Sequence, residues 1–207
     1  MPLLTGLLLS GLLAAAPVSS LAVEATAVEA NTVYAECGLQ GVMSAEAFRK
    51  AYLSMGPART GAKVLAVADM TRPSTEKRLF IIDLQNKRLL LNTWVAHGRN
   101  SGDLNCEKVS NRVGSLQTSK GLYRVGEKII SPKHGDALLL HGLNRGVNDK
   151  ALEREIIIHG ADYVSQSFIA EHGRCGRSFG CPAVPRDQMG RVIDLLANGG
   201  LLYVYAR

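Results

Sequence analysis

The sequence predicts a mainly β domain, a compact sandwich or barrel-like fold with a short N-terminal helix and one helix before the last strand. Short apolar segments recur at near-regular spacing and are separated by turn residues, which is typical of such folds. Strands do not alternate regularly with helices, which argues against a doubly wound parallel sheet. A chain of 207 residues is long enough for one domain with a full core.

The N-terminal region divides into a signal peptide and a lead. Residues 1–22 carry no charge, and a Leu/Ala/Gly run is followed by a small-residue stretch, which predicts cleavage after Ala22 and export to the periplasm or cell envelope. The apolar run is too short to favour a membrane span. Residues 23–62 form a mixed lead with one helix, 44–55, which Ser44 caps and Gly56-Pro57 ends.

Residues 63–207 contain the strand pattern of the main domain. Residues 63–69 are small and apolar, and 79–84 and 88–96 flank a turn at 85–87, which predicts a hairpin. Residues 98–114 are rich in Asn, Ser and Gly and predict a loop. Further strands are expected at 121–125, 137–141, 154–159 and 201–205, with a helix at 187–198 before the last of them.

Composition excludes few functions by itself. The net charge is +6, but the Lys and Arg residues are scattered and no nucleic-acid motif accompanies them, so no nucleic-acid partner is expected. A basic surface suits an anionic envelope polymer. If Cys181 is a free nucleophile, Cys37, Cys106 and Cys175 remain, and the sequence leaves their pairing open.

One histidine and one cysteine near the C-terminus predict a catalytic pair. The run Ile156-Ile157-Ile158 leads directly into His159-Gly160, and Cys181 follows 22 positions later, between Gly180 and Pro182. An imidazole that accepts the thiol proton makes the sulfur a nucleophile for acyl transfer. The amides of Phe179, Gly180 and Cys181 could converge on one oxygen as an oxyanion hole.

Three other interpretations share these residues. The segment 176–180 matches G-x-S-x-G, but a serine hydrolase elbow needs a following helix and a later histidine. His159, His172, Cys175 and Cys181 have zinc-ligand chemistry without the usual ligand spacing, so no metal is expected. A purely structural loop is the third alternative.

The segment 156–184 resembles the catalytic signature of YkuD-type L,D-transpeptidases, in which a strand-borne His-Gly precedes Ser/Thr-His-Gly-Cys. More specifically, residues 63–207 resemble the divergent murein L,D-transpeptidase catalytic domain branch (YkuD_2). Matching blocks occur in the same order at 78–84, 96–102, 133–135, 142–149, 158–165 and 176–184.

The resemblance implies a role for each matching residue. Cys181 would be the nucleophile and His159 the base, oriented by a main-chain carbonyl such as that of Gly160. The backbone around Phe179–Cys181 would hold the oxyanion. No cofactor is implied. The donor would be a peptidoglycan stem tetrapeptide that is attacked at its third residue and loses D-alanine, and an amine of a second stem would be the acceptor.

This sequence departs from the broad signature at two places. Phe179 replaces the second histidine, and Pro182-Ala183 replaces an apolar residue and an Arg or Asn. Arg177, with its neighbour Ser178, is therefore a candidate for contacting the substrate carboxylate, although a salt bridge within the loop would explain the arginine equally well. His97 is a further candidate for the cleft, and His134 a weaker one.

Two other functions remain open at this point. A hydrolase on the same stems would use the same thiol with water as acceptor. A non-catalytic wall-binding domain would need no nucleophile.

Overall fold

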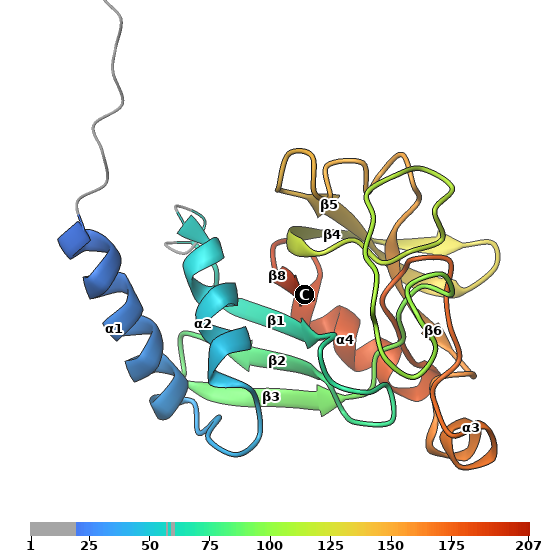
Figure 1. Ribbon diagram of the computed structural model, residues 1–207, viewed down its shortest axis with the longest axis horizontal. Coiled ribbons are helices and arrows are strands. Elements are labelled where there is room, and N and C mark those ends of the chain that lie inside the picture. Colours follow the sequence, from blue (N-terminus) through green and yellow to red (C-terminus); the bar gives the residue numbers. More distant parts are fainter. Residues whose placement is uncertain (1–19, 57, 59–60) are drawn as a thin grey trace, which may run out of the picture.

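The computed structural model describes residues 20–56, 58 and 61–207 (Figure 1). The predicted signal peptide, residues 1–22, therefore lies outside the described residues except for Ser20–Ala22. The elements follow in the order α1 (Ser20–Glu36), α2 (Ala45–Ser54), β1 (Val64–Asp69), β2 (Leu79–Asp83), β3 (Arg88–Thr93), β4 (Gly121–Ser131), β5 (Gly135–Gly142), β6 (Ile157–Ala161), α3 (Gln166–His172), β7 (Ala183–Pro185), α4 (Met189–Leu196) and β8 (Leu201–Tyr205). Within this part of the chain, no helix has the length and apolar character needed to cross a bilayer.

The strands form one mixed sheet in the order β3-β2-β1-β8-β4-β5-β6-β7. β8 pairs in parallel with β1 and antiparallel with β4, so the last strand of the chain lies in the middle of the sheet. β6 and β7 form the other parallel pair, in which His159 lies opposite Ala183. The remaining neighbours are antiparallel.

The two edges of the sheet meet, so that the sheet is nearly closed into a barrel. Ala96, just beyond β3, pairs with Ala183 of β7, and its amide donates to the Ala183 carbonyl at 2.8 Å. A second bridge joins Gly98 to Ser178. The mainly β, barrel-like prediction is therefore confirmed, and the seam of the barrel lies beside the cysteine loop.

Apolar side chains fill both faces of the central strands. On one face, Ala66 and Ala68 of β1 belong to a buried cluster with Val192 and Leu196 of α4. On the other face, the alternate residues of β1 pack with α2 and α1. Both helices lie at the β1–β3 end of the molecule, and α3 lies at the opposite end (Figure 1). Because both faces are covered, all of β2 is buried, and its residues from Leu79 to Ile82 form a continuous apolar run before Asp83.

Several predicted elements are confirmed. The helix 44–55 is α2, whose N-cap Ser44 accepts a hydrogen bond from the amide of Ala47. The hairpin is β2–β3, and the helix before the last strand is α4 after a single 3₁₀ turn at Arg186–Gln188.

Other expectations need correction. The lead after residue 22 is not irregular, because α1 runs through it to Glu36. The strand expected from residue 154 begins only at Ile157, because Glu155 has a left-handed backbone (φ 53°) that ends the preceding turn. β4 extends beyond residue 125 to Ser131 through an irregularity between Val125 and Lys128. Neither α3 nor the three-residue β7 is predicted from the sequence.

Candidate active site

The seam of the barrel positions the loop that carries Cys181. The amide of Ser178 donates to the His97 carbonyl at 3.0 Å, and the amide of Arg99 donates to the Ser178 carbonyl at 2.8 Å. At its C-terminal end the loop runs directly into β7, which pairs with β6. The loop is therefore held by main-chain hydrogen bonds from both edges of the sheet.

Ser178 also closes the loop internally. Its hydroxyl donates to the Cys181 carbonyl at 2.6 Å and accepts the Gly180 amide at 3.1 Å. The Gly180 amide is thus already used, whereas the amides of Phe179 and Cys181 donate no hydrogen bond to another described residue. These two, rather than Gly180, are the main-chain groups available to an oxyanion, and the side chain of Ser178 supports the loop instead of facing substrate.

Cys181 lies beside the start of β6. Its side chain is partly exposed, and its Sγ is 3.7 Å from the Glu155 carbonyl oxygen. Burial raises the pKa of the Cys181 thiol, while the Ile157 amide and Arg154 act in the opposite direction. The thiol is therefore protonated in the resting protein at neutral pH.

His159 lies on β6, two residues after Ile157 at the start of the strand, and its side chain is 1% exposed. Its Nδ1 lies 3.1 Å from the Gly160 carbonyl oxygen, and the ring of His134 stacks on it with centroids 3.7 Å apart. A carbonyl at Nδ1 requires the proton there, which leaves the Nε2 lone pair free to act as a base. Burial lowers the pKa of His159 to about 4, with smaller contributions from His134 and Arg186.

The structure places Cys181 and His159 along the same stretch of β6 but does not join them. Ala183 is opposite His159, so Cys181 lies two positions before that pair, roughly 7 Å along the strand direction. No hydrogen bond links Sγ to the His159 ring, although both residues are described. Catalytic hydrogen bonds are often long in the absence of substrate, so this separation does not argue against the pair.

The two other predicted substrate contacts have partners within the protein. Arg177 forms an ion pair with Asp103 at 3.1 Å and donates to the Gly102 carbonyl at 3.2 Å. His97 does not line a cleft, because its side chain is 1% exposed and its Nδ1 accepts from the buried Arg78 at 2.8 Å. Burial and the Arg78 charge lower the pKa of His97 to about 4.

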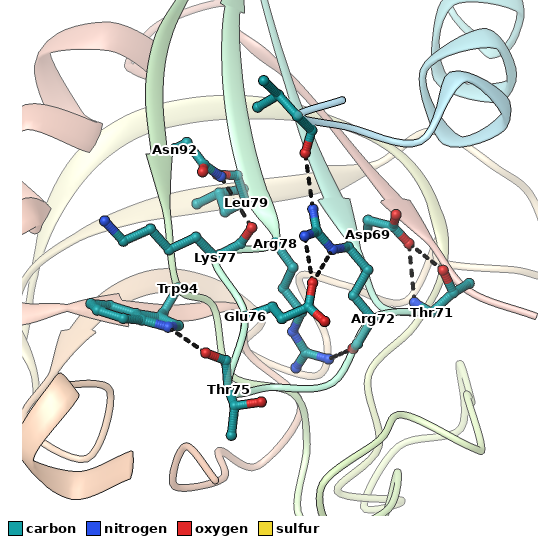
Figure 2. A network of polar contacts seen from close by, with 11 residues as sticks. Asp69, Thr71, Arg72, Thr75, Glu76, Lys77, Arg78, Leu79, Asn92 and Trp94 are labelled. Atoms are coloured by element: carbon teal, nitrogen blue, oxygen red, sulfur yellow. Dashed lines mark hydrogen bonds and ion pairs between the residues drawn. The ribbon is translucent and has the colours of Figure 1, made fainter. Parts of the chain in front are cut away.

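Arg78 anchors the segment that leads to His97. Its Nε donates to the Val95 carbonyl at 3.0 Å, and its Nη1 donates to the Arg72 carbonyl at 2.7 Å. Figure 2 shows the surrounding turn between β1 and β2, where Trp94 donates to the Thr75 carbonyl and Asn92 to that of Lys77. This network fixes one side of the seam against the β1–β2 turn.

Sequence reasoning missed two neighbours of the pair. Arg154 interacts with Cys181 from the turn before β6, and His134 reaches His159 from the β4–β5 turn. His134 was considered only for the cleft, and a basic residue before an apolar strand is too common a pattern to single out Arg154. Among the described residues, no group of three or more His, Cys, Asp or Glu side chains could hold a metal ion. All four cysteines are free thiols.

The fold and the site together define a class of protein: a mixed, nearly closed β-barrel whose seam carries a glycine-bounded cysteine loop near a buried histidine. The pattern of the family described as L,D-transpeptidase catalytic domain matches residues 40–205, and the chain belongs to this family. No curated protein sequence matches the chain.

Solved structures with a similar fold include three L,D-transpeptidases. The one from Mycobacterium smegmatis is 15% identical, with a TM-score of 0.43 over 70% of this chain and 59% of that chain. L,D-transpeptidase 3 from Mycobacterium tuberculosis is 13% identical, with a TM-score of 0.43 over 70% and 61%. The one from Stackebrandtia nassauensis is 13% identical, with a TM-score of 0.41 over 88% and 78%. This chain thus spans about three fifths of the length of the mycobacterial structures.

Proposed function

We propose that this protein is an exported cysteine L,D-transpeptidase that crosslinks peptidoglycan stem peptides between their third residues. The observation that carries the proposal is the Gly180–Cys181 loop, which is held at the barrel seam of a chain in the L,D-transpeptidase catalytic domain family. A partly exposed thiol, a buried imidazole with a free Nε2 and two unused amides provide the groups that acyl transfer needs.

The reaction has two acyl-transfer steps. Sγ of Cys181 attacks the carbonyl carbon of the third stem residue, and its proton passes to Nε2 of His159. The amides of Phe179 and Cys181 stabilise the resulting oxyanion. The carbon–nitrogen bond to D-alanine then breaks, and the leaving amine takes the proton from His159. An amine of a second stem attacks the thioester and gives its proton to His159; the carbon–sulfur bond then breaks, and the departing Cys181 sulfur takes that proton back from His159.

Export is part of the proposal, because the polymer lies outside the cytoplasmic membrane. The uncharged residues 1–22 supply the signal peptide, and the mature chain begins at Val23. N-terminal sequencing of the protein recovered from the cell envelope tests this step. A protein that keeps Met1 and remains in the cytoplasm contradicts it.

Carbapenem acylation and product analysis test the enzymatic proposal. Wild type should gain one carbapenem mass by intact-protein mass spectrometry, whereas Cys181→Ala should gain none and keep the wild-type circular dichroism spectrum. With stem tetrapeptides, wild type should release D-alanine and form dimers. Release of D-alanine without dimers in the presence of an amine acceptor would indicate a hydrolase, and turnover by Cys181→Ala would overturn the proposal.

A further inference from the structure

Arg154 carries a positive charge that no carboxylate balances within the described part of the chain. Its Nη1 donates to the Ser110 carbonyl at 2.8 Å and to the Ser119 hydroxyl at 2.9 Å. Its Nη2 donates to the Gln117 carbonyl and to the Ser115 hydroxyl. All these acceptors are neutral, and the side chain is partly buried. The guanidinium is therefore fixed in place while its charge stays uncompensated.

This charge lies directly behind the cysteine loop. A Cβ atom at Gly180 would lie 3.1 Å from Nη2 of Arg154 and 2.8 Å from the Gln117 carbonyl oxygen. Arg154 also lowers the pKa of the Cys181 thiol against the effect of burial, and the Cys181 thiolate raises that of Arg154. Close packing thus connects Arg154 to the Gly180–Cys181 segment, and the effect of its charge on the Cys181 thiol follows from that proximity.

Phe179, which replaces the second histidine of the broad signature, cannot supply a positive charge beside the Cys181 sulfur. Its ring is 61% exposed and lies under the Arg99 guanidinium, 5.7 Å from the ring centroid. His159 is neutral at pH 7, because burial lowers its pKa to about 4. Before His159 accepts the thiol proton, Arg154 is therefore the cation that favours negative charge on the sulfur of Cys181.

We propose that Arg154 is a positioning residue for the reaction: it braces the Gly180–Cys181 loop from behind and supplies the positive charge that stabilises the sulfur as it loses its proton. The proton goes to His159, the electron pair stays on sulfur, and no oxidant or reductant is involved. The inference concerns the thiol of the proposed function but does not require its substrate to be known.

The test is the pH dependence of Cys181 alkylation by iodoacetamide in the full-length protein, followed at the peptide level by mass spectrometry. Arg154→Met keeps an unbranched, flexible side chain and removes the guanidinium with its charge, so alkylation at pH 7.5 should slow about tenfold, which corresponds to a rise of one unit in the thiol pKa. Arg154→Lys keeps the charge and loses the planar fork, so its alkylation rate should stay within about threefold of wild type. The 98–118 loop between β3 and β4 supplies three of the acceptors of Arg154, and Arg112→Met, an exposed change on this loop, should match wild type.

A folded Arg154→Met protein with the wild-type alkylation profile would overturn the inference. Should Arg154→Met fail to fold, Arg154→Lys decides: a folded lysine variant that slows tenfold would show that the charge is not what matters. Because alkylation needs no peptidoglycan, failure of the inference about Arg154 can be distinguished from failure of the proposed function. A wild type that alkylates as expected but forms no carbapenem adduct would defeat the proposed function alone.

Discussion

Gly180 occupies a backbone conformation that a side chain would disturb in two ways. Its φ is +125°, which L-residues rarely adopt, and a Cβ there would press on the Gln117 carbonyl. The amide of Gly180 also donates to the Ser178 hydroxyl, so a shift at Gly180 moves Cys181, the proposed nucleophile, next to it. The loop geometry therefore depends on this one missing side chain.

Gly180→Ala should destabilise the fold by about 1–3 kcal/mol and slow carbapenem acylation by about 100-fold, because small misplacements of reacting groups are costly. Thermal unfolding and the rate of adduct formation measure the two effects. Gly190→Ala is the matched control, since a Cβ in α4 would meet open space and alanine favours helices. Acylation of Gly180→Ala at the wild-type rate would contradict the role given to the loop.

For single residues, the sequence predicts which side chains are candidates for the site better than it predicts what those side chains contact. The short segments around Cys181 and His159 single out both residues, because glycine, proline and an apolar strand next to them are local features. The hydrogen bonds and ion pairs of the other candidates cannot be inferred from neighbouring residues. Arg177 and His97 bond to residues far away in the sequence, and Ser178 bonds to Cys181 only because the loop closes on itself. Side chains that seem available to a substrate in the sequence are thus already bonded in the fold.

At the scale of elements, α1 is the clearest difference between sequence and structure. The segment Ser20–Glu36 contains neither Gly nor Pro and has five alanines, a composition that favours helix. Its small residues form no distinct apolar stripe, so the periodicity that reveals α2 is missing. α1 is ordered instead by packing, because Ala30 and Val33 are buried against the cluster that includes Phe48 of α2.

Ala30→Asp should lower the free energy of unfolding by about 2–4 kcal/mol, because it places a carboxylate in this apolar contact. Ala35→Asp makes the same change at an exposed position of α1 and should cost less than about 0.5 kcal/mol. Urea denaturation of both variants measures the difference. Equal stabilities would show that α1 does not pack on α2 in solution.

β7 and α3 are the two elements that the sequence pattern does not predict. β7 has three residues and exists because β6 and Ala96 offer it hydrogen-bond partners, not because of its own alternation. α3 has seven residues and only one buried side chain, although Ser165 caps it and Gly173 ends it in the left-handed region. Cap residues could have revealed α3, whereas nothing within residues 183–185 could have revealed β7.

For the whole molecule, the buried histidines link stability to pH. The pKa values of His97 and His159 fall from 6.5 to about 4 on folding, so between these values the unfolded chain binds a proton at each residue and the folded chain does not. Stability is therefore complete above pH 6.5 and is lost as the pH falls toward 4. The slope should reach at most about 1.4 kcal/mol per pH unit for each histidine.

Urea unfolding at intervals from pH 7.5 to 4.5 measures this slope. His159→Gln should reduce the slope by roughly half, because one of the two protons is no longer taken up. A free energy of unfolding that stays constant over this range would show that both histidines take up protons in the folded protein just as they do in the unfolded chain.

The overall topology was only partly predictable. Short strands and few helices predict a barrel-like domain, but pairing across long sequence separations is invisible to local patterns. Ala96 meets Ala183 because the sheet curves until its edges touch, and β1 meets β8 through a direct parallel ladder between segments far apart in the sequence. These long-range contacts, rather than any single element, bring the 98–118 loop, the turn before β6 and the cysteine loop together.

The central position of β8 also sets the order in which the protein can become active. Within the sheet, β8 (Leu201–Tyr205) joins the strands β3-β2-β1 to the strands β4-β5-β6-β7, and it is synthesised after all seven of them. A growing chain, or one threading N-terminus first through a translocation pore, carries Cys181 well before its sheet is complete. Cys181 therefore remains in an incomplete sheet until β8 has been synthesised and has paired with β1 and β4.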